Sequence, residues 1–180
     1  MMIVSGGARG VDSYAADLAR KKGMVVKTIK PIQNTAEKYT RGLLVELDMV
    51  MHIEGTEKLL EANKTLKRHV SDRLLRTGLL QRNYHIIQDV NVVLALGHFE
   101  NREKQILQGG TGWSVQMAID AKKPVYVYID EDECWYVYNY TEKQFVPSFY
   151  PTLDKECTAI VGSRNITDNM KLQLKKFIYC

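Results

Sequence analysis

The chain has 180 residues, of which 45% are hydrophobic and 26% charged, as expected for one globular domain with its own core. No apolar run reaches the roughly 20 residues of a transmembrane helix, and the first residues lack the pattern of a secretory signal peptide. The net charge of +4 suits an anionic small molecule and is modest for a nucleic-acid binder, and three scattered cysteines argue against a disulfide framework or a metal site.

The first half of the chain alternates between strand-like and helix-like segments. The expected elements are a strand at 2–5, a helix at 11–22, a strand at 25–29, a loop at 31–40, a segment at 43–53 that suits helix or strand, and helices at 57–75 and 79–89.

The second half continues this alternation and then departs from it. We expect a strand at 91–96, a polar loop at 98–108, a helix at 109–121, a strand at 124–129, an aromatic hairpin at 134–150, and a strand and helix at 158–180. The alternation predicts an α/β fold, a parallel sheet with helices on both faces. The added hairpin is expected to cover a sheet edge or to contact another copy in a homo-oligomer, a dimer or tetramer.

Three turns rich in small residues follow predicted strands. They are Gly6-Gly7-Ala8-Arg9-Gly10, Gly109-Gly110-Thr111-Gly112 and Gly162-Ser163-Arg164. In open α/β sheets ligands bind outside the carboxyl ends of the strands, and amides at the following helix N-termini hold anions. The three turns therefore predict a phosphate site, with Arg9 and Arg164 adding positive charge.

Two of these turns resemble signatures of the SLOG superfamily, Rossmann-like proteins that include the cytokinin-activating LOG phosphoribohydrolases and the DNA-processing protein DprA. "VSGGARGVD" is similar to the second-strand signature, and "VGSR" at 161–164 is similar to the first-strand signature. Because the order is reversed here, the resemblance implies a circular permutation within a single domain, 1–180, with 158–180 supplying the family's first strand and helix. The segments 31–75 and 134–150 match the family loosely or not at all.

Two further stretches resemble the catalytic motifs of LOG enzymes. "RNYHIIQDVNVVLAL" places Arg82 at the family's arginine, and "QGGTGWSVQ" replaces the motif's proline, threonine and glutamate with Gln108, Trp113 and Gln116. A carboxylate can stabilise or attack the anomeric carbon of a nucleotide, whereas an amide cannot. Gln116 therefore argues against LOG-type hydrolysis, unless another acid such as Asp12 or Glu100 takes over.

These observations favour binding of a nucleotide or nucleotide-derived ligand, ADP-ribose-like or a nucleoside monophosphate, by a cytoplasmic protein without a metal or other cofactor. The expected ligand-binding residues are Gly6, Gly7, Ala8, Arg9, Gly10, Arg82, Asn83, Gly109, Gly110, Thr111, Gly112, Trp113, Gly162, Ser163 and Arg164, and the catalytic candidates are Arg82, Gln116 and Asp12.

Alternatives stay open at this stage. The chain could be a nucleotide N-glycosidase or a DprA-like binder of single-stranded DNA. Asp12 could only complement the dipole of its helix, and Arg82 could pair with a structural carboxylate. Trp113 could stack on a base or pack the start of its helix.

Overall fold

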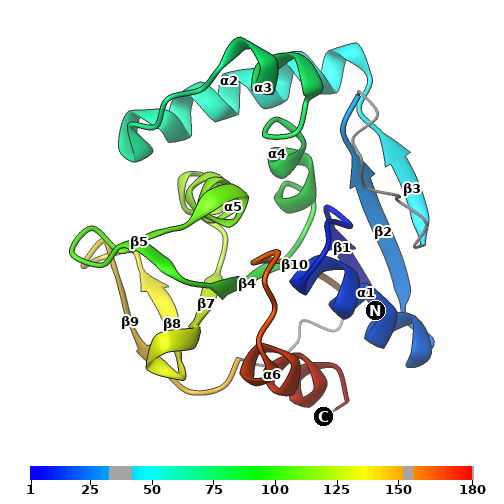
Figure 1. Cartoon of the computed structure of the whole chain (residues 1–180), viewed down its shortest axis with the longest axis vertical. Helices are drawn as coiled ribbons and strands as arrows, with labels where there is room; N and C mark the ends of the chain where they lie inside the picture. Colours follow the sequence, from blue (N-terminus) through cyan, green and yellow to red (C-terminus); the bar gives the residue numbers. More distant parts are fainter. Residues whose placement is uncertain (33–41, 152–155, 180) are drawn as a thin grey trace.

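The fold is built on a mainly parallel sheet, seen in a computed structural model that describes residues 1–32, 42–151 and 156–179. The eight-stranded sheet has the order β3-β2-β1-β10-β4-β7-β8-β9 (Figure 1). Its strands are β1 (Met2–Ser5), β2 (Val25–Lys30), β3 (Leu43–Glu46), β4 (Val92–Gly97), β7 (Val125–Ile129), β8 (Cys134–Asn139), β9 (Gln144–Ser148) and β10 (Cys157–Gly162). The strands from β3 to β7 pair in parallel, whereas β8 and β9 are antiparallel.

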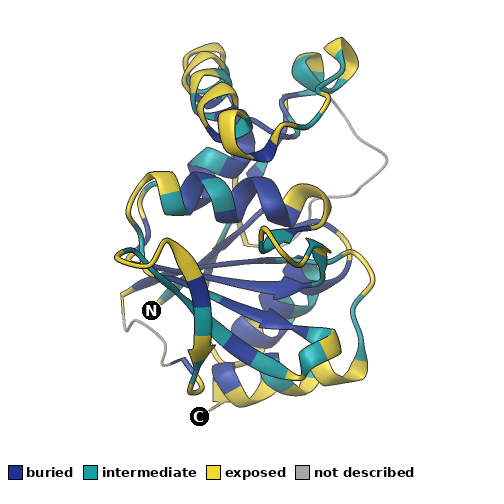
Figure 2. Ribbon diagram, turned by 90° about the vertical axis from the view of Figure 1, so that its left-hand side faces the viewer, coloured by how far each residue is buried: buried dark blue, intermediate teal, exposed yellow. Residues whose placement is uncertain are grey.

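Helices cover both faces of this sheet, and Figure 2 shows the buried strands between the two helical layers. The helices are α1 (Val11–Lys21), α2 (Met49–Leu66), α3 (Asp72–Thr77), α4 (Arg82–Ile87), α5 (Gly109–Asp120) and α6 (Asp168–Tyr179). Successive residues of β4 pack on opposite faces of the sheet. Leu94 belongs to the core formed with α1 and α6, and Val93 belongs to the core formed with α2, α4 and α5. This arrangement confirms the predicted α/β, Rossmann-like fold.

Strand β10 lies in the middle of the sheet, between β1 and β4. Its register pairs Thr158 with Ile3 on one side and with Val92 on the other, both in parallel. The expectation that the strand at 158–161 joins the centre of the sheet beside β1 is therefore confirmed. The circular permutation, which the resemblance implies through the reversed order of the two signatures, stays a prediction.

Two segments differ from the sequence-based expectations, and a third, which was left open between helix and strand, contains both. The segment 98–108, expected to be a loop, forms a short antiparallel pair, β5 (Phe99–Asn101) and β6 (Ile106–Leu107). Gln105 fastens this pair to β9, because its side chain both donates to the carbonyl and accepts from the amide of Phe145, at 3.0 and 2.6 Å. The segment 43–53 contains β3 and the start of α2.

The helix expected at 57–75 is two helices. It is interrupted because Lys67 adopts a left-handed conformation (φ 51°) at the end of α2, and Ser71 caps the start of α3 by accepting from the amide of Leu74. The aromatic hairpin is confirmed as β8 and β9, which extend the sheet edge beyond β7. Most of the loop expected at 31–40 lies outside the described residues. None of the described helices is long and apolar enough to span a membrane.

Candidate functional site

The first glycine turn, between β1 and α1, is organised around the buried carboxylate of Asp12. One carboxylate oxygen accepts from the amide of Gly6 and the other from the amide of Gly162, each at 3.1 Å, and the amide of Ala8 also bonds to this side chain. Burial raises the pKa of Asp12 to about 6, although the nearby Arg82 guanidinium acts in the opposite direction. Asp12 therefore joins the ends of β1 and β10 and does more than complement a helix dipole.

Two further amides in and directly after this turn are also bonded within the protein. The amide of Gly7 donates to the Ser5 hydroxyl at 3.2 Å, and the amide of Val11 donates to the carbonyl of Ser163 at 3.0 Å. Gly10 has φ +98°, and a Cβ at this position would lie 2.3 Å from that same carbonyl oxygen. The glycine at position 10 thus permits close packing of two turns, and the first turn is closed by its own contacts.

Arg82 braces the same region from α4. Its Nη1 donates to the carbonyls of Gly6 at 2.7 Å and Ile29 at 3.3 Å, so one buried guanidinium joins the ends of β1 and β2. A Cβ on Gly6 would lie 3.1 Å from both Arg82 and Asp12, which places these opposite charges side by side. This arrangement fits the alternative drawn from the sequence, in which Arg82 pairs with a structural carboxylate.

The second glycine turn, at the start of α5, has a different structure. Gln108 occupies the N-cap position without a side-chain hydrogen bond to the helix. A Cβ built on Gly109 or Gly110 would meet no atom within 4 Å, so the backbone there borders open space. By contrast, α6 has its first turn capped, because Thr167 accepts from the amide of Met170 at 3.1 Å. Of the three helices that follow the small-residue turns, α5 is therefore the one whose first residues border open space.

Gly112, in the same turn, serves packing. A Cβ there would lie 2.1 Å from the carbonyl oxygen of Leu107 and 2.9 Å from the guanidinium of Arg68. Arg68 donates to the carbonyls of Leu107 and Gly109, pairs with Glu100, and lies over the Trp113 ring at 5.7 Å. This arginine, which follows the end of α2, holds the loop before α5 in place.

A cavity of about 530 Å³ lies at the carboxyl ends of β4 and β10, in front of α5. The expected site residues that line it are Ala8, Asp12, Arg82, Asn83, Gly109, Gly110, Thr111, Trp113, Gly162, Ser163 and Arg164. The expected residues absent from its lining are Gly6, Gly7, Arg9, Gly10, Gly112 and Gln116. The sheet thus brings parts of all three turns to one cavity, but the first turn contributes little open backbone.

Gln116 lies away from this cavity. Its side chain donates to Asp120 at 2.8 Å, one turn further along α5, and it lines a separate cavity of about 300 Å³ between α5 and the two hairpins. A catalytic role at the strand ends does not fit this position, because the side chain lies on a different side of the helix from the cavity.

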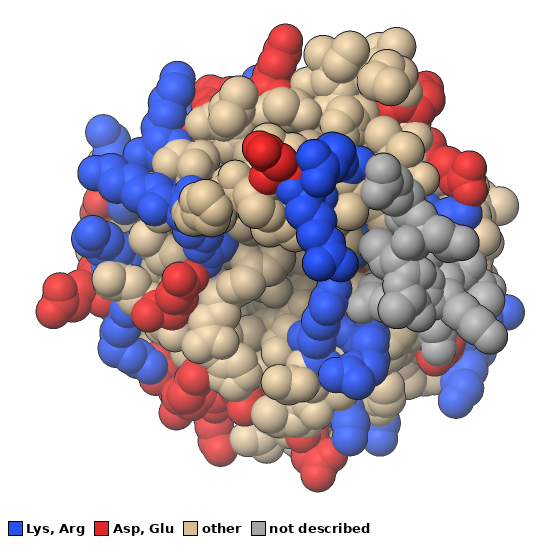
Figure 3. All heavy atoms as spheres, turned by 45° about the horizontal axis from the view of Figure 1, so that its top comes forward, with Lys and Arg blue, Asp and Glu red and all other residues tan. Residues whose placement is uncertain are grey.

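Sequence reasoning missed several polar residues of the cavity wall: Arg68, His69, His98, Gln108 and Asn165. His98 had a usable signal, since it directly follows β4 and the carboxyl ends of parallel strands collect ligand-binding groups. Figure 3 shows Lys and Arg side chains grouped beside a hollow lined mainly by uncharged residues. Within the described ranges, no group of three or more His, Cys, Asp or Glu side chains is arranged to hold a metal ion.

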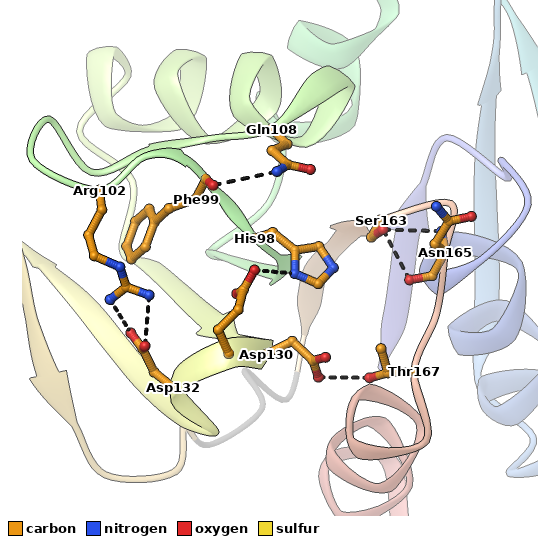
Figure 4. A network of polar contacts seen from close by, with 10 residues as sticks. His98, Phe99, Arg102, Gln108, Asp130, Asp132, Ser163, Asn165 and Thr167 are labelled. Atoms are coloured by element: carbon orange, nitrogen blue, oxygen red, sulfur yellow. Dashed lines mark hydrogen bonds and ion pairs between the residues drawn. The ribbon is translucent and has the colours of Figure 1, made fainter.

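The rim of the cavity is held by a short acidic turn, η1 (Asp130–Asp132), which follows β7 (Figure 4). Each of its residues bonds to a different segment. Asp130 accepts from the Thr167 hydroxyl at 2.7 Å, Glu131 lies 2.7 Å from the Nδ1 of His98, and Asp132 pairs through both oxygens with Arg102 at 2.8 and 2.9 Å.

Comparison with known proteins supports the fold. No family model and no curated protein matches the chain. One solved structure is similar, that of a protein from Syntrophus aciditrophicus SB that carries the provisional name molybdenum carrier protein. The two share 14% sequence identity and a TM-score of 0.59, over 99% of this chain and 94% of the other. At this identity the likeness establishes a common Rossmann-like fold over the whole chain.

Proposed function

We propose that this chain binds a nucleotide or nucleotide-derived ligand whose phosphate lies at the N-terminus of α5. The observation that carries the proposal is the uncapped start of α5 beside open space at Gly109 and Gly110, in the wall of a cavity of about 530 Å³. A helix N-terminus presents unbonded amides and the positive end of the helix dipole, which together favour an anion.

The surroundings support an anionic ligand of this size. Arg68, Arg82 and Arg164 line the cavity, and Asp12 is the one carboxylate in its lining among the residues that the structure describes. Cavities of about 300–1,000 Å³ hold small organic ligands and cofactors. A nucleoside monophosphate with its phosphate at α5 fits these requirements, whereas a strand of nucleic acid requires an extended basic groove.

The resemblance to the SLOG superfamily supports the same ligand class. The "VGSR" and "VSGGARGVD" stretches end two adjacent central strands, β10 and β1, with the Rossmann-like fold that the resemblance implies. We include in the proposal that the chain is a circularly permuted member of this superfamily.

A second candidate ligand comes from the similar solved structure, whose provisional name is molybdenum carrier protein. Molybdenum in the form of an oxyanion would suit the amides at the start of α5 for the same electrostatic reason as phosphate. A nucleotide N-glycosidase is the enzymatic alternative. It would have to use Asp12, the carboxylate in the cavity lining, although both oxygens of that carboxylate already accept backbone amides.

The test is binding measured by calorimetry with AMP, ADP-ribose, inorganic phosphate and molybdate. We expect micromolar or tighter binding of at least one nucleotide. Gly110→Asp should reduce the affinity at least 100-fold, because it places a carboxylate beside the first turn of α5, where a Cβ meets no neighbour. Thr141→Asp is the matched control, since it adds the same charge on the exposed turn between β8 and β9.

Gly110→Asp should also keep the melting temperature of the wild-type protein, because nothing in the described chain crowds this position. A nucleotide that binds equally well to wild type and Gly110→Asp would place the ligand elsewhere. Tight molybdate binding without nucleotide binding would favour the second candidate.

A further inference from the structure

His98 is a cavity residue with a fixed orientation. It follows β4 directly, its side chain is 23% exposed, and its ring lies between Glu131 and the Ser163–Asn165 turn (Figure 4). Nδ1 is 2.7 Å from the carboxylate of Glu131, and Figure 4 shows the other ring nitrogen directed toward the Ser163–Asn165 turn. Within the part of the chain that the structure describes, no group forms a hydrogen bond with this second nitrogen.

The Glu131 contact determines which ring nitrogen carries the proton. An ionised carboxylate only accepts hydrogen bonds, so Nδ1 must be the protonated nitrogen. In the neutral imidazole, Nε2 is then an acceptor with its lone pair directed toward the cavity. The neighbouring Ser163 hydroxyl does not satisfy it, because that hydroxyl donates to the carbonyl and accepts from the amide of Asn165, both at 3.1 Å.

The acidic turn η1 keeps Glu131 in this position. Its flanking residues are tied to two other segments, Asp130 to Thr167 before α6 and Asp132 to Arg102 in the β5–β6 pair. The imidazole of His98 is therefore already held in place by a turn that is fixed on both sides. Little conformational entropy is lost when a ligand bonds to its second nitrogen.

We propose that His98 accepts a hydrogen bond from a hydroxyl group of the ligand, so that the site selects hydroxyl-bearing phosphate esters over bare oxyanions. This inference rests on the proposed function, because it assumes that the phosphate lies at α5. The two walls of the cavity then perform different tasks. The amides of α5 hold the anion, and His98 recognises the hydroxyl of an attached sugar.

The experiment compares the affinities of AMP, 2′,3′-dideoxy-AMP and inorganic phosphate for the wild-type protein and three variants. Wild type should bind AMP about tenfold more tightly than the dideoxy analogue, as one well-formed hydrogen bond predicts. His98→Phe keeps a ring of similar shape without nitrogen atoms. It should bring the ratio of the two affinities close to one and leave the affinity for inorganic phosphate unchanged.

Glu131→Gln tests the orientation of the imidazole. A glutamine amide can donate to Nδ1 and so favour the tautomer with a proton on Nε2, which should lower the AMP preference about as much as His98→Phe. Glu142→Gln is the matched control, because it makes the same change from carboxylate to amide on the exposed turn between β8 and β9, outside the cavity lining. It should retain the tenfold preference.

The outcomes separate this inference from the proposed function. Equal binding of AMP and its dideoxy analogue to wild type, or a preference that survives His98→Phe, overturns the role of His98 while the phosphate site stands. Binding of inorganic phosphate without AMP overturns both the role of His98 and the proposal that the ligand is a nucleotide, and leaves only an anion site at α5. Absence of binding by all of these ligands overturns both proposals.

Discussion

The turn before α1 and the turn before α5 are both short, glycine-rich and placed after a strand, yet their surroundings differ. In the first turn, the amides of Gly6, Gly7 and Val11 all bond to groups of the protein. In the second, Gly109 and Gly110 border open space. A glycine-rich turn can therefore allow two loops to pack closely or allow a ligand to approach the backbone. The atoms that surround each glycine decide between these two roles.

The largest effect on stability should come from a methyl group added to the first turn, and the same change in the second turn is its control. Gly10→Ala places a Cβ 2.3 Å from the carbonyl oxygen of Ser163 at a φ of +98°, and should lower the free energy of unfolding by about 3 kcal/mol. Gly110→Ala meets no neighbour and should leave that free energy unchanged or raise it by up to about 1 kcal/mol. Urea denaturation measures both variants, and similar stabilities would remove the distinction between the turns.

The closed turn should also be sensitive to pH through Asp12. Its pKa is about 6 in the folded protein against an ordinary value of 3.8, so the folded state holds this proton more tightly than the unfolded chain does. The associated stability is fully present below about pH 4 and is lost as the pH rises to about 6, and it amounts to about 3 kcal/mol.

Asp12→Asn removes this titration, since asparagine does not ionise in that range. The free energy of unfolding of wild type minus that of the variant should therefore fall by about 3 kcal/mol between pH 4 and pH 7 and then stay level. Denaturation curves at four pH values measure it. Parallel pH profiles for the two proteins would show that Asp12 has no raised pKa.

The smallest effect is expected for Gln116→Glu, which introduces the glutamate that the LOG motif carries at the corresponding position. Because Gln116 lies outside the cavity and bonds to Asp120, the new carboxylate should cost about 0.3 kcal/mol through repulsion along α5. Nucleotide affinity and release of free base should both equal those of wild type. A gain of base release would show that this side of α5 reaches the ligand.

The sequence predicted the sheet better than the site, for a physical reason. Buried parallel strands such as β4 are continuous apolar runs, and the alternation of strands with helices fixes their parallel packing. The partners of a turn are set by tertiary contacts: Asp12 bonds to Gly162, which is far away in the chain. Periodicity along the sequence carries no signal for such a contact.

The same limit explains the two elements that differ from expectation. The β5–β6 pair depends on the contacts of Gln105 with Phe145, a residue of a different hairpin. The break after Lys67 depends on a left-handed residue that composition does not mark. His98 could have been noticed from its place directly after β4, but its contact with Glu131 joins residues that are distant in the sequence and carries no sequence signal.

The central position of β10 has a consequence for how the chain folds during its synthesis. Met2 pairs with Cys157, so the strand that neighbours β1 is synthesised more than 150 residues after β1 itself. Until then β1 and β4 each lack a partner on their facing sides, and both are apolar edges that invite pairing with other nascent chains. Closing such a long-range pair is slow. We therefore expect chains that end before β10 to aggregate more readily than the full 180 residues.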